Sequence, residues 1–235
     1  KGKGRGKEVL SVIRGADLVI LITEIGKEAM LAAMQEELFG AGVRINQKRP
    51  QIHFEKRSSG GIQVRGIKQK ASGETLQAIF REFGFKNVEI TLKDSMDLEA
   101  LIDALAMNRV FVPAVSIINK AELYGRPLPR SSRTDRNSSI YISAKEGTGL
   151  DNLREAIWDK LGLVRVYLSK PGGLPDYDMP MIMKSGDTLK SVVEKIGPRG
   201  EGKTRARISG PGSKFSNQLV SLSIRVVDGI VVTFE

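Results

Sequence analysis

Two short apolar runs constrain the fold of this chain more than any other feature of its sequence. They lie at residues 17–22 and 112–118, and each has the length of a strand with almost no polar interruption. Strands without alternation are typical of parallel sheets in which helices cover both faces. A helical pattern follows the first run, from Lys27 to Phe39, and ends at Gly40. The sequence therefore predicts an α/β fold with a parallel sheet.

Residues 45–111 have a different pattern, which predicts a small α+β unit inserted into that sheet. Two alternating segments flank the glycine-containing stretch Arg57–Gly61, and this combination predicts a β-hairpin. Ser72 has the residue type of a helix N-cap, with Glu74 in the first turn. The expected elements are strands at 51–54 and 62–65, a helix from residue 72, a strand at 88–92 and a helix at 97–107.

The sheet pattern resumes after the inserted unit, and the chain ends in a β-rich region. An arginine-rich loop at 126–137 leads to a strand at 139–142 and then to a helix at 150–161. Asp228 and Gly229 predict a two-residue hairpin turn between the last two strands. The elements expected in the C-terminal region are strands at 164–168, 180–183, 205–208, 222–227 and 230–234 and one helix at 188–196. This region has a β-grasp-like pattern.

The charge of the chain is strongly positive and unevenly distributed. There are 37 Lys+Arg and 27 Asp+Glu residues, which give a net charge of +10 and favour polyanionic partners such as nucleic acid. Eight basic residues and one acidic residue lie between positions 44 and 70. Further basic clusters lie at 1–7, 126–136 and 197–214. Charge that is localised in this way indicates docking surfaces.

Composition also excludes several classes of function. The chain has no cysteine, which excludes disulfide scaffolds, thiolate metal sites and cysteine nucleophiles. The single histidine, His53, argues against His-dependent triads and multi-His metal sites. No apolar run approaches the roughly 18 residues of a membrane helix, and no signal-peptide pattern follows the basic start. Because the first residue is not Met, we expect the chain to be a fragment of a longer protein.

One segment, Gly197–Thr204, matches the phosphate-binding pattern G-x-x-x-x-G-K-[ST] at every required position. A true phosphate-binding loop follows a buried strand and opens a long helix. Here a helical pattern precedes the segment and a short strand-like stretch follows it, which is the reverse order. We therefore expect a glycine-rich basic turn, which is suited at most to contacting the phosphate backbone of RNA.

Two other polar segments fit their context. Asn119–Glu122 follows the apolar run at 112–118, and Ser143–Lys145 follows the strand expected at 139–142. Both therefore lie at the carboxyl ends of adjacent predicted strands, where open α/β sheets bind ligands. The first resembles the N-K-x-D guanine-specificity motif of GTPases, and the second resembles the S-A-K element of the same base pocket. The alternative reading is that both are ordinary capping residues after two strands.

This resemblance implies a definite role for each residue of the two segments. Glu122 would accept from the N1–H and the exocyclic amine of guanine, a pair of donors that adenine lacks. Lys120 and Lys145 would sandwich the base, the Ala144 amide would bind its O6, and Asn119 would tie the loops together. Glu122 stands where Asp is usual in the motif, so the contact either shifts or weakens. The predicted guanine-binding residues are Asn119, Lys120, Glu122, Ser143, Ala144 and Lys145.

With these motifs, the chain resembles the developmentally regulated GTP-binding proteins, the DRG branch of the Obg-like GTPases. Residues 3–20 are similar to the stretch just beyond the D-x-P-G switch of that family. The resemblance implies a partial P-loop-GTPase sheet, an inserted unit like the second domain of ribosomal protein S5, and a C-terminal β-grasp TGS domain. The predicted domains are 1–44 and 112–163 for the two parts of the GTPase sheet, 45–111 for the inserted unit and 164–235 for the TGS domain.

The family resemblance also implies a function. It implies a cytoplasmic, translation-associated GTPase that binds GTP or GDP, with Mg²⁺ in the intact protein, and that associates with the ribosome or RNA. The TGS domain would offer a site for a protein partner, and no membrane partner is implied. Because the phosphate-binding and Mg²⁺-binding motifs are missing from these 235 residues, we assign no catalytic or metal-binding residue and expect the fragment to be inactive. The alternative is a non-enzymatic RNA- or ribosome-binding module with a vestigial nucleotide site.

The basic clusters supply the candidate RNA contacts. They lie in the inserted unit and in the glycine-rich turn of the C-terminal region. The candidates are Arg44, Lys48, Arg49, Lys56, Arg57, Arg65, Lys68, Lys70, Arg199, Lys203, Arg205 and Arg207.

Overall fold

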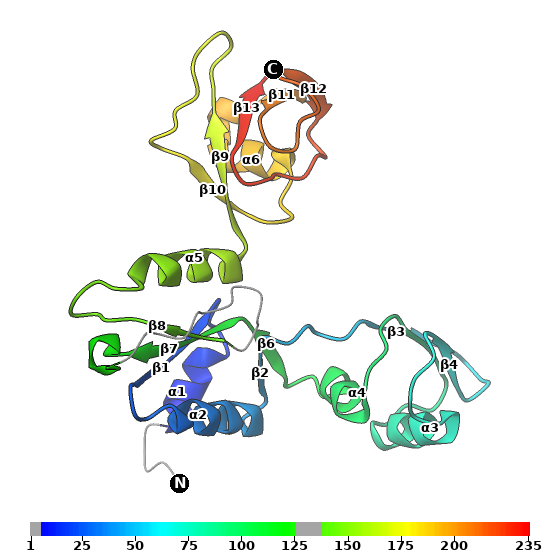
Figure 1. The fold of residues 1–235 in the computed structure, drawn as a ribbon. Coiled ribbons are helices and arrows are strands. Elements are labelled where there is room, and N and C mark those ends of the chain that lie inside the picture. The colour runs from blue at the N-terminus through cyan, green and yellow to red at the C-terminus, as the bar shows by residue number, and fades with distance from the viewer. Residues whose placement is uncertain (1–5, 126–137) are drawn as a thin grey trace. The chain divides into compact units, whose positions relative to one another are not determined.

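The computed structural model describes residues 6–125 and 138–235, as a mixed α/β structure (Figure 1). The chain forms two compact units, Lys1–Glu146 and Gly147–Glu235, and each is described by itself below. In the described residues no helix is both long enough and apolar enough to cross a membrane.

The first unit contains the predicted parallel sheet, in the order β1 (Val19–Glu24), β7 (Ala114–Asn119) and β8 (Ser139–Tyr141). Helices α1 (Gly6–Ile13) and α2 (Ala29–Gly40) lie on the same side of this sheet (Figure 1). Their apolar side chains share one core with β1 and β7. The α/β prediction is therefore confirmed for this unit.

The burial of the second apolar run agrees with the prediction, and the burial of the first differs from it. In β7, Val115 and Ile117 on one face and Ala114 and Ile118 on the other are all buried. In β1 only one face is buried, because Ile20 and Ile22 are 41% and 57% exposed. We expected both runs to be covered on both faces. The difference follows from position, since β1 lies at the edge of the sheet among the described strands.

A separate parallel pair leads into and out of the inserted unit. It consists of β2 (Val43–Ile45) and β6 (Val110–Val112). Pro113 separates β6 from β7, so the predicted strand at 112–118 is divided between two sheets. Proline has no amide hydrogen and interrupts the ladder, while its carbonyl oxygen still accepts from Val19 at 2.9 Å.

The inserted unit has the predicted ββαβα order but not the predicted hairpin. Its three strands are arranged β3-β5-β4, so β5 lies between the two strands that we expected to pair. β5 is antiparallel to β3 and parallel to β4. The three inward-facing residues of β5 are fully apolar and buried, which makes it the natural central strand. The elements are β3 (Ile52–Lys56), β4 (Ile62–Gly66), α3 (Gly73–Glu82), β5 (Val88–Leu92) and α4 (Leu98–Leu105).

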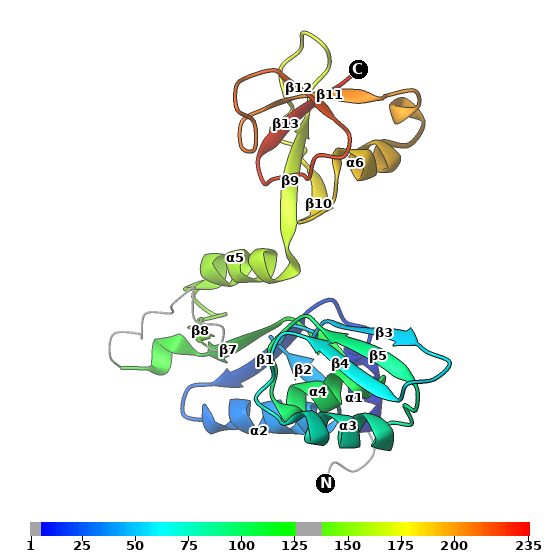
Figure 2. The ribbon, with the colours of Figure 1, turned by 90° about the vertical axis from the view of Figure 1, so that its right-hand side faces the viewer.

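Both helices of the inserted unit cover one face of its sheet (Figure 2). Each begins at a side-chain N-cap: Ser72 Oγ accepts from the Thr75 amide, and Asp97 Oδ1 accepts from the Ala100 amide at 2.8 Å. Phe80 is fully buried at the centre of the core. The N-cap predicted at Ser72 is therefore confirmed.

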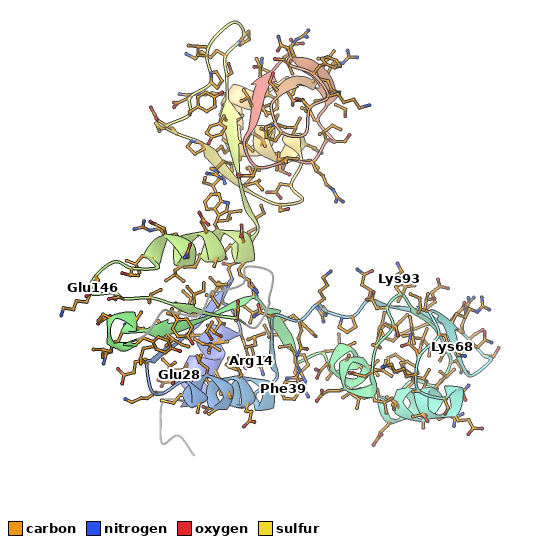
Figure 3. The ribbon with its side chains drawn as sticks, in the orientation of Figure 1. Arg14, Glu28, Phe39, Lys68, Lys93 and Glu146 are labelled. Atoms are coloured by element: carbon orange, nitrogen blue, oxygen red, sulfur yellow. The ribbon has the colours of Figure 1, made fainter. Side chains whose placement is uncertain are left out.

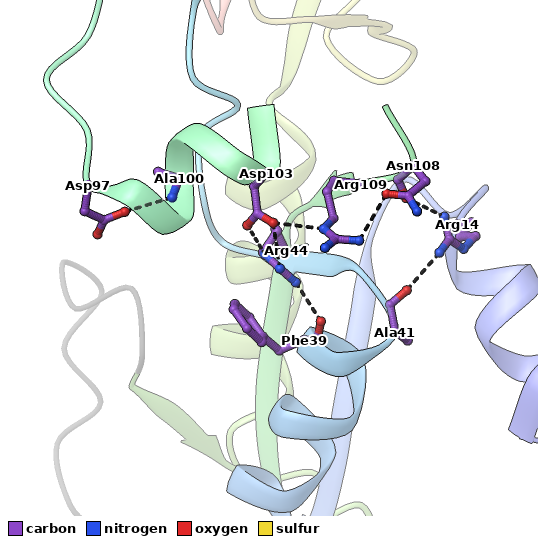
Figure 4. Close-up of polar contacts among 9 residues, drawn as sticks. All are labelled: Arg14, Phe39, Ala41, Arg44, Asp97, Ala100, Asp103, Asn108 and Arg109. Atoms are coloured by element: carbon purple, nitrogen blue, oxygen red, sulfur yellow. Dashed lines mark hydrogen bonds and ion pairs between the residues drawn. The ribbon is translucent and has the colours of Figure 1, made fainter. Parts of the chain in front are cut away.

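A buried charge cluster joins the inserted unit to the sheet (Figure 4). Asp103 on α4 accepts from Arg44 on β2, including Arg44 Nη2 at 2.8 Å, and from Arg109 Nε at 2.9 Å. Arg44 also donates to the Phe39 carbonyl oxygen at the end of α2, at 2.7 Å. Arg14, the residue after α1, donates to the Asn108 and Ala41 carbonyl oxygens, both at 2.8 Å. The Asp103 side chain is only 5% exposed.

Burial disfavours the ionised form of Asp103, but the hydrogen bonds and charges of its two arginines outweigh this effect. The pKa of Asp103 is therefore held below its ordinary value. The cluster therefore favours an ionised Asp103 between two arginines at the junction of two structural parts.

The second unit is a five-stranded mixed sheet with the order β10-β9-β13-β11-β12. Two adjacent interior strands, β9 and β13, are parallel, and they are the first and last strands of the region. Helix α6 contributes Leu189 and Val192 to the core beneath them. The elements are α5 (Leu150–Leu161), β9 (Leu163–Leu168), β10 (Met181–Lys184), α6 (Leu189–Ile196), β11 (Arg205–Ser209), β12 (Gln218–Ser221) and β13 (Ile230–Phe234).

One expectation for this unit differs from the structure. Residues 222–227 form no strand, so Asp228 and Gly229 do not join a hairpin. Both neighbours of β13 are already occupied, by β9 and β11, which leaves no edge for that segment. Asp228 instead accepts from the Arg165 amide at 2.7 Å and pairs with its guanidinium group. This compact unit begins at residue 147 and includes α5, and the predicted domain boundaries stay a prediction.

Candidate functional site

The two polar segments that follow β7 and β8 meet at one edge of the first sheet. Asn119 is the last residue of β7, and residues 142–145 continue from β8. Asn119 Oδ1 accepts a hydrogen bond from the Ala144 amide at 3.1 Å. The backbone adds a second connection, because the Ala121 amide donates to the Ile142 carbonyl oxygen at 2.9 Å. The side chain of Asn119 therefore ties the two loops together.

Lys120 turns the chain away from β7 in the left-handed conformation, with φ 63° and ψ 39°. The short 3-10 helix η1 (Ala121–Leu123) begins at the next residue. A positive φ is uncommon for a residue other than glycine, so the surroundings must hold it. The Lys120 ammonium forms an ion pair with Glu24 at the end of the neighbouring strand β1. Glu24 pairs with Lys27 as well.

Glu24 is a residue of this region that the sequence analysis missed. Hydrogen bonds from Lys120 and Lys27, with their charges, lower the pKa of Glu24 from 4.5 to about 2. The same hydrogen bond raises the pKa of Lys120. A signal for Glu24 was available, because it ends an apolar strand and the carboxyl ends of parallel strands share one edge.

Glu122 has one carboxylate oxygen without a partner. Ser143 donates a hydrogen bond to the carboxylate, and the pKa of Glu122 falls below its ordinary value because of this bond, of a backbone hydrogen bond and of the charges of Lys145 and Lys120. The Oε2 atom is buried and has no hydrogen-bond partner among the residues that the structure describes. A buried acceptor without a donor is costly, so it marks a place where a ligand N–H fits.

The predicted guanine-binding residues differ in exposure. Ser143 is buried, and its Oγ accepts from the Glu146 amide at 3.1 Å. Ala144 and Lys145 are exposed. Figure 3 shows Glu146 at the outer end of this loop. The site thus combines one ionised carboxylate, two lysines and two loops joined by hydrogen bonds, which suits a planar ligand that carries N–H donors.

No group of three or more acidic or histidine side chains that could hold a metal ion occurs in the described part of the chain.

The segment that matches the phosphate-binding pattern has the predicted reversed context. It follows α6, forms a short 3-10 turn at Gly197–Gly200 and leads into β11. Gly200 packs so closely on α6 that a Cβ atom there would lie 2.6 Å from the Val193 carbonyl oxygen. Packing therefore explains Gly200, which is not one of the two glycines that the pattern requires.

Arg44 is a correction to the predicted RNA contacts. It is 3% exposed and its guanidinium group is used by Asp103 and by the Phe39 carbonyl oxygen. The guanidinium carbon also lies 3.5 Å from the centre of the Phe39 ring. A buried and fully paired arginine cannot reach a phosphate backbone, so Arg44 has a structural role.

The other candidate RNA contacts in the inserted unit are exposed, but two of them form ion pairs. Arg57 and Arg65 both bind the Glu89 carboxylate on the outer face of the small sheet, Arg65 at 3.0 Å. Figure 3 shows Lys68 and Lys93 on the same unit. The remaining exposed candidates of this unit are Lys48, Arg49, Lys56, Lys68 and Lys70.

The four candidates in the second unit lie around β11. Arg199 and Arg205 are exposed. Arg207 forms an ion pair with Glu235, and Lys203 donates to the Phe234 carbonyl oxygen at 3.4 Å. RNA contact by these residues, and by the exposed residues of the inserted unit, stays a prediction.

Comparisons with known proteins show which proteins this chain is similar to. A family model described as the C-terminal region of the MMR_HSR1 domain matches residues 59–163. An uncharacterized GTP-binding protein of Methanocaldococcus jannaschii is 34% identical over 239 residues, covering 99% of this chain and 61% of that protein. Developmentally-regulated GTP-binding protein 1 of Xenopus laevis is 31% identical over 80% of this chain and 52% of its own length. The chain is a homologue of the developmentally-regulated GTP-binding proteins.

The human member of this group called developmentally-regulated GTP-binding protein 2 is 29% identical and covers 95% of the chain. The chain spans about three fifths of the length of the first two relatives, 61% and 62%. Among solved structures, a GTP-binding protein from Pyrococcus horikoshii OT3 matches 58% of this chain with a TM-score of 0.36 and 18% identity.

Proposed function

We propose that this chain binds the base of a guanine nucleotide at the carboxyl edge of the first sheet, as the base-recognition part of a GTPase of the DRG type. The observation that carries the proposal is the buried, unpartnered Oε2 of Glu122 beside the loops that Asn119 ties together. The names of the homologous proteins support the same ligand class.

The chemistry of the base explains the selectivity that we expect. Guanine presents N1–H and an exocyclic amine on one edge, and a carboxylate accepts both. Adenine presents an acceptor at the equivalent ring nitrogen and would face the Glu122 carboxylate with a lone pair. Rejection of a ligand that leaves buried polar groups unpaired is strong. Ser143 supports this role, because its hydrogen bond keeps Glu122 ionised.

We propose that GTP hydrolysis belongs to the longer protein and uses phosphate and Mg²⁺ contacts from outside these residues. The exposed Ile20 and Ile22 on the edge strand β1 support a sheet that further structure completes. We further propose that the inserted unit is related to the second domain of ribosomal protein S5. The C-terminal sheet, with its parallel β9 and β13, would be a TGS domain in a cytoplasmic protein and would offer a site for a protein partner.

A second candidate function is a non-enzymatic module that binds ribosomal or other RNA, alone or beside the nucleotide site. The observation that favours it is the set of exposed basic side chains in the inserted unit, which includes Lys48 and Arg49. Cations of this kind attract a phosphate backbone without reading its sequence.

The proposed function is tested by calorimetric titration of the chain with guanosine, GDP, adenosine and ADP. We expect guanine ligands to bind and adenine ligands to bind at least about tenfold more weakly, the factor that corresponds to one lost charged hydrogen bond. Asn119→Ala removes the tie between the loops and should weaken both guanine ligands. Equal affinities for guanine and adenine ligands would refute the base-recognition role and leave the RNA-binding alternative.

A further inference from the structure

Glu24 lies on a different strand from both predicted guanine-binding segments, yet it reaches into their site. It is the last residue of β1 and lies opposite Asn119 in the parallel register. Its carboxylate forms an ion pair with the Lys120 ammonium. None of the sequence motifs includes this residue. Glu24 therefore connects the neighbouring strand to the residue whose side chain would flank the base.

The position of Glu24 is itself well determined. The Lys27 amide donates to the Glu24 carbonyl oxygen at 3.0 Å, and Thr23 Oγ1 donates to the Lys27 carbonyl oxygen at 2.9 Å. Glu28 Oε1 accepts from the Gly26 amide at 3.1 Å and closes the same turn. The Lys27 ammonium binds the second side of the Glu24 carboxylate. The carboxylate thus has a fixed place before any ligand binds.

Lys120 is held at both ends of its side chain. At its Cα the left-handed conformation fixes the direction in which the side chain leaves the backbone. At its tip the ammonium is bound by Glu24. Ordering a lysine side chain costs conformational entropy. If the side chain becomes ordered only when the ligand binds, this cost reduces the binding free energy.

We propose, on the basis of the proposed function, that Glu24 is a positioning residue for base recognition: it holds the Lys120 side chain in place so that its methylene groups form one wall of the guanine site. The Glu24 carboxylate also offsets the positive charge of the Lys120 ammonium, so this lysine contributes apolar surface to the site and little net charge. Glu24 itself does not contact the base. The role would be shared with no other described acidic residue, because Glu122 is bound by Ser143.

The test compares Glu24→Gln with Lys27→Gln in titrations with guanosine, which has no phosphate. Lys27→Gln is the matched control, because it removes the other partner of Glu24 and leaves the Lys120 pair and the backbone bonds of the turn. The ion pair is partly exposed, 51% and 27% for the two side chains. We therefore expect Glu24→Gln to weaken guanosine binding about threefold to fivefold, in the range of partly exposed pairs, and Lys27→Gln to have little effect.

Two further readouts separate positioning from a general loss of structure. Guanosine is neutral, so any salt dependence of its binding reports on charges within the protein. Wild-type affinity should fall from low to high salt as the pair is screened, and the affinity of Glu24→Gln should stay constant. Glu24→Asp keeps the charge and should recover part of the affinity. The Ala144 amide resonance should remain in place in all variants, which shows that the Asn119 tie is intact.

Each outcome decides the proposal. If wild-type protein binds guanosine and Glu24→Gln binds it equally well, the positioning role is refuted and the proposed function stands. If Lys27→Gln loses as much affinity as Glu24→Gln, the turn and not the Lys120 pair is responsible, and the role is also refuted. If the wild-type protein does not bind guanosine, both the proposed function and the role of Glu24 fail.

Discussion

Two regions of the first unit contain the same arrangement of charges but differ in burial. At the junction with the inserted unit, Asp103 is held by Arg44 and Arg109. At the carboxyl edge of the sheet, Glu24 is held by Lys120 and Lys27. Each is one carboxylate between two cations. The Asp103 side chain is 5% exposed, whereas that of Glu24 is 27% exposed.

The difference in burial decides what each cluster does. A buried charge without a partner is strongly destabilising, so the loss of either Arg44 or Asp103, which are 4% and 5% exposed, should destabilise the fold. Solvent screens the partly exposed cluster, and its net contribution to stability is small. The edge cluster is therefore free to serve ligand binding, while the buried cluster fixes how the inserted unit joins the sheet. The following predictions test this distinction.

The largest effect is expected for Asp103→Ala. It leaves the Arg44 guanidinium buried without its carboxylate, which should lower the free energy of unfolding by about 3–5 kcal/mol. Chemical denaturation followed by circular dichroism, with hydrogen exchange at α4 and β2, measures the loss. Glu24→Gln is the comparison variant and should leave the unfolding free energy close to that of the wild type. Similar losses in both variants would contradict the distinction.

The next effect concerns ligand affinity and not stability. Glu122→Gln keeps the size of the side chain but replaces an acceptor with an amide, so guanosine affinity should fall at least about tenfold. Xanthosine, which carries a carbonyl oxygen where guanosine has its amine, should bind relatively better to this variant. Calorimetric titration measures both ligands. An unchanged preference for guanosine would show that Glu122 does not contact the base edge.

Acid pH should affect both clusters in the same direction. Burial raises the pKa of Asp103, but the hydrogen bonds from Arg44 and Arg109 lower it further, so the folded value is below the unfolded value. Its contribution to stability is then present above the unfolded pKa and is lost as the pH falls through the folded pKa. The unfolding free energies of wild type and Asp103→Asn should therefore converge only below about pH 4.

For Glu24, hydrogen bonds from Lys120 and Lys27 lower the pKa from 4.5 to about 2. The ion pair with Lys120 should persist while ordinary glutamates are protonated and should break only as the pH approaches 2. The difference in guanosine affinity between wild type and Glu24→Gln should accordingly be unchanged between neutral pH and pH 4.5. A difference that vanishes near pH 4.5 would show that Glu24 has an ordinary carboxyl group.

The smallest effect is expected at a third carboxylate between two cations, Glu89, which is 12% exposed and binds Arg57 and Arg65. Glu89→Gln releases Arg65 on the outer face of the small sheet, whereas Arg57 keeps its ion pair with Glu55 at 3.3 Å. If this face contacts RNA, the variant should bind RNA more tightly and with a steeper salt dependence, by about 0.9 in logarithmic slope for each new phosphate contact. A filter-binding assay over a salt series measures it. Unchanged binding would argue against RNA contact by this face.

Much of the fold could be predicted from local patterns. The apolar runs predict strands, the periodic apolar faces predict helices and Ser72 predicts a helix start. Each of these patterns depends only on neighbouring residues. The reversed context of Gly197–Thr204 could also be read in this way, since a helical pattern precedes it. One topological rule about parallel strands placed the two polar segments at the same edge, and the resemblance to the GTPase motifs implied the tie by Asn119 that the structure shows.

What the sequence determined by itself is the type of most elements and the polar residues that follow β7 and β8. The tertiary structure alone decided which strand lies between which: β5 separates β3 from β4, and β13 pairs with β9 and β11, which leaves residues 222–227 outside the sheet. It also buried Arg44 and brought Glu24 to Lys120. These outcomes depend on contacts between residues far apart in the chain, where the burial of a charge or the filling of a sheet edge is settled only once the whole core is packed.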